Sequence, residues 1–107
     1  NVKSIKFEIG SKFNHSIDNL PINIENLELG RYFDQLIDNL PSNLLYLHFD
    51  KYSYFDNLID NLPHNLIYIH FGWYFNKPIN NLPNTLKKLC IITLVLFLLL
   101  QLYLDLF

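Results

Sequence analysis

Four side chains with metal-binding or nucleophilic chemistry recur along this chain at nearly equal steps. They are Glu28, His48, His70 and Cys90, separated by 20, 22 and 20 residues. Carboxylate, imidazole and thiolate groups are the usual ligands of zinc, and a Cys–His pair can form a hydrolytic nucleophile. Ligands in equivalent positions of a repeat form a straight column, however, and a column converges poorly on a tetrahedron. No CxxC or HxxxH spacing is present either. We therefore expect no metal, no cofactor and no enzymatic activity.

The spacing of these residues follows a sequence repeat. The pattern Phe-x-x-x-Ile-x-Asn-Leu-Pro occurs four times, beginning at Phe13, Phe33, Phe55 and Phe75. A fixed period of this size is typical of a solenoid, in which each unit is too small to bury its apolar face and stacks on its neighbours. We expect one solenoid over residues 1–91. Its repeats should lie near 1–12, 13–32, 33–54, 55–74 and 75–91.

A second pattern, apolar-x-x-apolar-x-apolar, lies between each Pro and the next Phe. Its last two apolar positions are two residues apart, which places both side chains on one face of a strand. The pattern predicts a strand of three to five residues in every repeat. The first repeat fits this pattern when Ser4, Phe7 and Ile9 take its three apolar positions, with the polar Ser4 as the one exception.

The ends of the strands and the return segments have their own signals. We expect positive φ at Gly10, Gly30 and Gly72, with Asp50 as a tolerable substitute. The Asn-Leu-Pro step cannot lie inside an α-helix, because Pro lacks an N–H donor and forces the preceding residue to be extended. The return segments should therefore be extended or form 3₁₀ turns. The Asn residues of these steps could bond between coils through stacked amides; they are Asn19, Asn39, Asn61 and Asn81.

These elements resemble the FNIP-repeat family, which is named for Phe-Asn-x-Pro and is allied to leucine-rich repeats. The segment Phe75–Ile79 matches that element directly, and the other copies keep its Phe. The resemblance implies an α/β-horseshoe-like repeat solenoid, mostly of short parallel β-strands lining a concave face, with extended or 3₁₀ return segments. The family occurs in amoebae and in large viruses that infect them, often behind an F-box that recruits a ubiquitin ligase. No F-box is present in this sequence, so the resemblance would make it the substrate-recruiting part of such a protein.

The residues between the apolar strand positions should point out of the concave face in two columns. We align Lys6, Asn26, Tyr46, Tyr68 and Lys88 in one column, and Glu8, Glu28, His48, His70 and Cys90 in the other. Neighbouring strands are about 4.8 Å apart, so the members of a column become neighbours. Since Tyr often anchors interfaces, we predict a partner-binding surface. Its residues are Tyr46, His48, Tyr68, His70, Glu28 and Lys88. The alternative is a solvated Tyr/His face that only maintains solubility.

Residues near the strand ends and at the C-terminus add two further expectations. The pairs Arg31-Tyr32, Lys51-Tyr52 and Trp73-Tyr74 follow the strands and should form a rim, with two extra residues making a bulge at 50–54. Residues 92–107 form a hydrophobic tail that breaks the repeat. This tail is a membrane anchor, a cap over the last coil or a degenerate, frame-shifted end. An anchor needs about 20 apolar residues, which the tail approaches only if Gln101 and Asp105 are tolerated.

Composition limits the function. The net charge of −2 and the single Arg provide no basic surface for nucleic acid. One Cys excludes an internal disulfide and fits a reducing compartment, so we expect the cytoplasm, or the host cytoplasm if the protein is viral. The chain lacks an N-terminal signal peptide and an initial Met, which indicates a fragment. We predict a non-catalytic module that binds another protein, with no small-molecule substrate and with membrane contact only through the tail. The alternative is a membrane-tethered or degenerate remnant without a selected partner.

Overall fold

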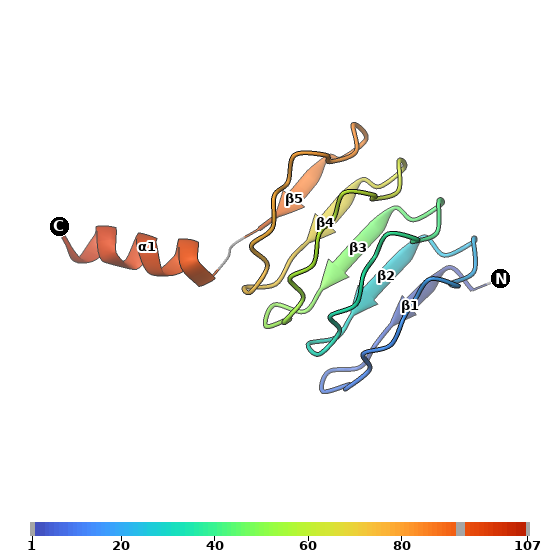
Figure 1. Cartoon of the computed structure of the whole chain (residues 1–107), viewed down its shortest axis with the longest axis horizontal. Coiled ribbons are helices and arrows are strands. Elements are labelled where there is room, and N and C mark those ends of the chain that lie inside the picture. Colours follow the sequence, from blue (N-terminus) through green and yellow to red (C-terminus); the bar gives the residue numbers. More distant parts are fainter. Residues whose placement is uncertain (1, 92–93, 107) are drawn as a thin grey trace.

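The chain folds as a repeat solenoid with one parallel sheet (Figure 1). The computed structural model describes residues 2–91 and 94–106, and for residues 94–97 the backbone alone. The strands pair in chain order and are β1 (Ser4–Lys6), β2 (Asn26–Leu29), β3 (Tyr46–Phe49), β4 (Tyr68–His70) and β5 (Lys88–Cys90). Residues 2–91 contain no helix. The predicted horseshoe-like solenoid of short parallel strands is therefore confirmed.

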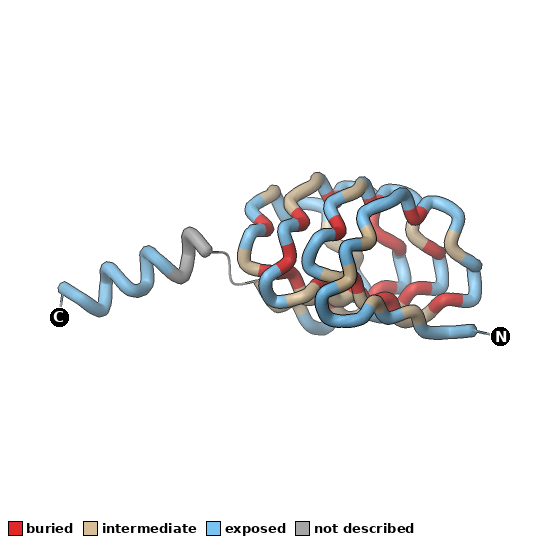
Figure 2. The backbone as a smooth tube through the Cα atoms, turned by 90° about the horizontal axis from the view of Figure 1, so that it is seen from below, coloured by how far each residue is buried: buried red, intermediate tan, exposed pale blue. Residues whose placement is uncertain are grey.

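The interior consists of apolar rows with one residue from each coil (Figure 2). In the strands, Leu27, Leu47 and Ile69 pair with one another and are fully buried. On the return side the repeated Phe rings stack, with successive centroids 6.3, 6.3 and 6.0 Å apart and planes within 15°. Burying one such side chain contributes about 1.5–3 kcal/mol, and the rings of Phe33 and Phe55 are covered by equivalent rings on both sides. Stacking therefore provides the burial that a single repeat lacks.

Each return segment turns at its Pro. The N–H of the residue three positions after Pro donates to the Pro carbonyl at 3.1–3.3 Å, which is the bond of a single 3₁₀-type turn. The four pairs are Pro21 with Ile24, Pro41 with Leu44, Pro63 with Leu66 and Pro83 with Leu86. The expected extended or 3₁₀ return path is confirmed, and each turn brings the chain directly to the start of the next strand.

The first coil differs from the predicted alignment by two residues. Ser4 pairs with Asn26, and Lys6 pairs with Glu28 instead of Asn26. Ile5 and Phe7 pack against the core, whereas Ile9, which we expected inside, is 94% exposed. The reason is that register follows the residues that face the core. A shift of two keeps the same face inward and brings Ile5 and Phe7 against the core.

The coils alternate in length. The first residues of successive strands are 22, 20, 22 and 20 positions apart, so the structural period is a pair of coils. The long coils contain the predicted bulge at 50–54 and its counterpart at 8–12. In both, a Ser Oγ accepts the N–H of the next Phe, from Phe13 to Ser11 at 3.2 Å and from Phe55 to Ser53 at 3.1 Å. The extra residues therefore form an ordered turn.

The glycines act differently from our expectation. Gly10 alone has positive φ, at 87°, so the prediction is wrong for Gly30 and Gly72 and for Asp50. Gly72 is required for another reason: a Cβ there would lie 2.5 Å from the carbonyl oxygen of Asp50 and 2.8 Å from the Cβ of Ser53. At Gly30 the nearest atom would be 3.6 Å away, which is ordinary van der Waals contact. The long turn of one coil thus packs tightly against the glycine of the next.

A helix follows the solenoid. Helix α1 (Leu94–Asp105) points away from the last coil (Figure 1), and residues 98–106, in the helix and just after it, are exposed (Figure 2). Leu86 and Leu89 of the last coil stay only partly buried. Within the described residues, no helix has both the length and the apolar character needed to cross a bilayer. Residues 92, 93 and 107 of the predicted tail lie outside the described residues.

Candidate partner-binding surface

The strand side chains that alternate with the core residues form one face, which we call the outer sheet face. Its first row is Ser4, Asn26, Tyr46, Tyr68 and Lys88, and its second row is Lys6, Glu28, His48, His70 and Cys90. The six residues predicted to bind a partner all lie in these rows. The predicted columns need a correction in the first coil, where Ser4 takes the place of Lys6, Lys6 takes the place of Glu8, and Glu8 lies beyond β1.

The middle of the outer sheet face is aromatic. The rings of Tyr46 and Tyr68 lie 6.3 Å apart, and those of His48 and His70 lie 4.5 Å apart. His48 also lies 6.5 Å from Tyr68, so the two rows form one continuous patch. A shallow hollow of about 230 Å³ opens on it, lined by Asn26, Glu28, Tyr46, His48 and Tyr68. The patch therefore combines flat apolar surface with polar groups at its edges.

Opposite charges stand at the two ends of this patch. On the β2 side, the carboxylate of Glu28 lies 3.7 Å from Nζ of Lys6 and 3.5 Å from Nδ1 of His48. On the β5 side, Nζ of Lys88 lies 5.7 Å from the ring centroid of Tyr68. Exposed ion pairs of this kind contribute only about 0–1 kcal/mol to the stability of the fold. These charges are therefore available to orient a bound molecule.

Burial changes the protonation of two residues in the patch. It lowers the pKa of His48 below its usual 6.5; charge on His70 acts in the same direction, and Glu28 opposes it. Burial also raises the pKa of Tyr68. Nδ1 of His70 lies 3.1 Å from the carbonyl oxygen of Phe49, which can only accept, so this nitrogen is the donor. The lowered pKa favours the neutral imidazole of His48, which can both donate and accept a hydrogen bond.

The candidate metal ligands and nucleophiles expected from the sequence form one row, namely Glu28, His48, His70 and Cys90. Each residue comes from a different strand, and the pairing places them side by side along the sheet. In the part of the chain that the structure describes, no three His, Cys, Asp or Glu side chains gather as metal ligands. The four residues therefore lie side by side along one row of the outer sheet face.

Our sequence reasoning missed the role of the residue that follows each repeated Phe. Its side-chain oxygen accepts the N–H of the equivalent residue in the next coil: Asn14 from Asp34 at 2.8 Å, Asp34 from Asp56 at 3.2 Å and Asp56 from Asn76 at 2.8 Å. Asn and Asp interchange here because both carry an acceptor at the same place. We call this set the Asn/Asp ladder; the recurring Phe-Asn or Phe-Asp pair was its signal.

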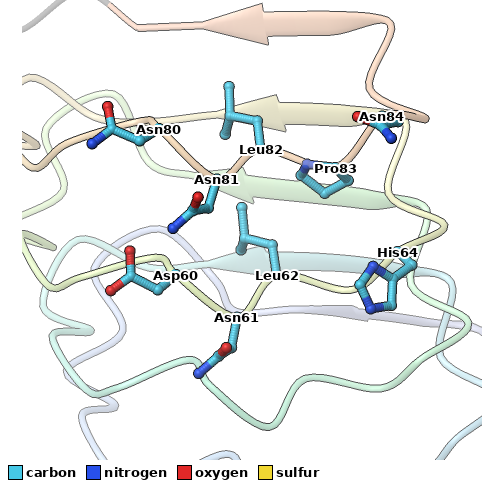
Figure 3. A pocket seen from close by; sticks show the side chains of 9 residues that line it. All are labelled: Asp60, Asn61, Leu62, His64, Asn80, Asn81, Leu82, Pro83 and Asn84. Atoms are coloured by element: carbon cyan, nitrogen blue, oxygen red, sulfur yellow. The ribbon is translucent and has the colours of Figure 1, made fainter.

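The Asn residues before Leu-Pro form a less regular set than we expected. The amide of Asn39 donates to the carboxylate of Asp18 in the preceding coil, at 3.4 Å. Between the last two return segments a hollow of about 490 Å³ opens instead, and Asn61 and Asn81 line it (Figure 3). In this view both amides point in the same direction. This hollow lies on the return side and is separate from the outer sheet face.

Comparison with known proteins adds one match. The family model of the FNIP repeat matches residues 13–52 and 55–93. These stretches begin 42 residues apart, which equals one long and one short coil of the structure. No curated protein and no solved structure matches the chain. The family unit thus corresponds to the pair of coils seen in the fold.

Proposed function

The chain belongs to the FNIP-repeat family, and we propose that it is a non-catalytic module that holds another protein on its outer sheet face. FNIP repeats are a repeat family generally implicated in protein interaction, and a repeat solenoid fits a non-enzymatic scaffold. The observation that carries the proposal is the continuous patch of Tyr46, Tyr68, His48 and His70. The core rows are built by the neighbours of these residues, so the apolar core does not depend on Tyr or His at the outward positions.

The patch has the properties of an interface centre. Tyr rings supply a large contact area with little loss of side-chain entropy, and interface hot spots are enriched in Tyr. A partner side chain would enter the hollow between Asn26 and Tyr68 and displace water from the rings. Glu28 and Lys88, at opposite ends, would attract a cationic and an anionic group of the partner. This arrangement would select both the partner and its orientation.

The setting of the module is part of the same proposal. The free thiol of Cys90 suits a reducing compartment such as the cytoplasm. Within a longer F-box-type protein, the solenoid would recruit the substrate that the ubiquitin ligase modifies. A partner that is ubiquitinated only when it can bind the outer sheet face would support this role.

The experiment compares two double variants by the amount of partner protein that each captures from a cell lysate. Tyr46→Ala with Tyr68→Ala should reduce recovery of the captured protein at least about tenfold, as expected for two interface anchors. The control is Leu36→Ala with Leu58→Ala, two exposed apolar residues on the return side. Circular dichroism should be unchanged in both. Equal capture by the Tyr variant and the wild-type chain would refute the proposal.

A further inference from the structure

A second aromatic surface lies at the loops that follow β2, β3 and β4, apart from the outer sheet face. We call it the strand-end rim; its residues are Arg31, Tyr32, Lys51, Tyr52, Tyr54, Trp73 and Tyr74. The three residue pairs expected from the sequence to form a rim do gather here, and Tyr54 of the long coil joins them. The four Tyr rings are each 38–47% exposed. Such a concentration of exposed aromatic side chains needs an explanation beyond folding.

The rings of the rim are arranged in order. Tyr32, Tyr54 and Tyr74 form a row with centroids 5.7 and 5.1 Å apart. Each directly precedes a buried Phe of the core, which fixes its position. Beside this row, Tyr52 and Trp73 meet edge to face at 5.1 Å.

Backbone hydrogen bonds extend the sheet pairing into these loops. Tyr54 N–H donates to the carbonyl of Arg31 at 2.9 Å, and Trp73 N–H donates to that of Lys51 at 3.0 Å. The loops are therefore joined to one another before any partner binds. A pre-organised surface loses less entropy on binding than a mobile one.

Two cations lie on these rings. The guanidinium carbon of Arg31 is 5.1 Å from the ring centroid of Tyr54, and its Nη2 donates to the Tyr54 hydroxyl at 3.0 Å. Nζ of Lys51 is 5.2 Å from the ring centroid of Trp73 and 5.6 Å from that of Tyr52. Asp50 is turned toward its own loop, where it accepts the N–H of Tyr52 at 2.8 Å.

Neither cation has an acidic partner within the described ranges. The ion pairs there involve other residues, namely Lys3 with Glu25, Lys6 and His48 with Glu28, and Lys77 with Asp56. Arg31 and Lys51 are thus held in place by aromatic rings and, among the described residues, form no ion pair. This leaves a surface complementary to carboxylates flanked by apolar groups.

We propose that the strand-end rim binds an acidic segment of a protein. Carboxylates of the segment pair with Arg31 and Lys51, and its apolar side chains pack on the row of Tyr32, Tyr54 and Tyr74. Arg, Tyr and Trp are the residues most enriched at interface hot spots, and an Arg–carboxylate pair adds directional hydrogen bonds. Aromatic rings with Arg also suit single-stranded nucleic acid. Tracking a phosphate backbone takes many more cations than these two, so the acidic segment is favoured.

The test uses the single Trp of the chain, Trp73, as a probe placed in the rim itself. The full chain is titrated with a synthetic twelve-residue peptide of Glu, Leu and Ser, and with the same peptide carrying Gln in place of Glu. Trp73 emission and calorimetric heat are recorded together. The Glu peptide should change the emission and bind more weakly as salt is added, because exposed charges are screened. The Gln peptide should bind at least about tenfold more weakly.

Variants separate this proposal from the proposed function. Arg31→Gln with Lys51→Gln should weaken binding of the Glu peptide about tenfold, whereas the charge-keeping pair Arg31→Lys with Lys51→Arg should retain most of it. Tyr46→Ala with Tyr68→Ala should bind the Glu peptide normally even when capture on the outer sheet face is lost. Equal binding of the two peptides, absence of both emission change and heat, or tighter binding of an oligothymidine would each overturn the proposal.

Discussion

The inner and the last return segments of the solenoid carry the same sequence pattern in different surroundings. Ile37 and Ile59 lie in segments covered on both sides and are 1% and 3% exposed. Ile79 occupies the same position in the last return segment of the described solenoid and is 40% exposed. The residue type and the local turn are the same, so the difference comes from the missing neighbour. Burial in this protein is therefore a property of the stack, and at this position it is lost at the C-terminal end of the stack.

Hydrogen bonds show the same contrast. The side-chain oxygens of Asp34 and Asp56 each accept an N–H from the next coil, and Asp34 also accepts the amide of Asn57 at 2.7 Å. In the described structure the Asn/Asp ladder ends at Asn76. Stability should accordingly be highest in the middle coils and fall toward the ends, where local opening is easiest. Matched substitutions in a middle and an end coil can test this gradient.

The largest expected effect is at the Phe row. Phe55 is 1% exposed and stacks between Phe33 and Phe75, so Phe55→Ala should reduce the free energy of unfolding by about 3–5 kcal/mol. Phe13 is only partly buried at the N-terminal end, and Phe13→Ala should cost about half as much. Urea unfolding followed by circular dichroism measures both. Equal losses would show that stability is not graded along the stack.

A smaller effect is expected at the glycines that face the long turns. Gly72→Ala places a Cβ against the backbone of Asp50 and should destabilise the fold by about 1–3 kcal/mol. Gly30→Ala meets no atom closer than 3.6 Å and needs no positive φ. It should be neutral or stabilising by about 0.4–1 kcal/mol, because Ala has less freedom in the unfolded chain. Thermal melts compare the two variants, and a Gly30→Ala loss as large as that of Gly72→Ala would contradict this packing.

Substitutions in the Asn/Asp ladder should cause a smaller loss of stability. Asp34→Ala removes the acceptor of two inter-coil hydrogen bonds and should cost about 1–2 kcal/mol. Asp34→Asn keeps the acceptor, as Asn14 does one coil earlier, and should stay close to the wild-type chain. Asn76→Ala, at the end of the ladder, should change the free energy of unfolding by less than about 0.5 kcal/mol. A similar loss at positions 34 and 76 would argue against the ladder.

The smallest expected effect is a pH dependence at His48. Its pKa is lowered in the folded chain, so the unfolded chain binds more protons once the pH falls below about 7. Stability should therefore decrease as the pH drops through 6.5 toward the lowered pKa. The slope should be shallow, because the imidazole is 36% exposed and Glu28 and Asp50 oppose the shift.

His48→Gln should flatten this slope, and His64→Gln, on the exposed return side, serves as the control. Melting temperatures recorded between about pH 7.5 and about pH 5 measure the effect. If the gap in melting temperature between the wild-type chain and His48→Gln stayed constant across this range, His48 would not be the cause.

Much of the fold and of the candidate surface followed from local patterns. The spacing of Leu44, Leu47 and Phe49 predicted a strand with a buried face, and Pro41 predicted the turn before it. The residues predicted to bind a partner were correctly placed in outward rows because side chains alternate along any strand. The first coil was misaligned because two apolar patterns two residues apart both fit it. Only contact with β2 distinguishes them.

The sequence alone determined that the coils stack, because a short repeat must bury its apolar face against its neighbours. It also determined which side chains point inward, because alternation along a strand and the restrictions of Pro act within a few residues. The tertiary structure decided everything that depends on residues one coil apart. It showed that Gly72 is required by the approach of Asp50, that Asn14 and Asp34 join coils, and that Arg31 and Lys51 lie on the rings of the rim. These contacts join positions about 20 residues apart, and their geometry exists only once the coils are superimposed.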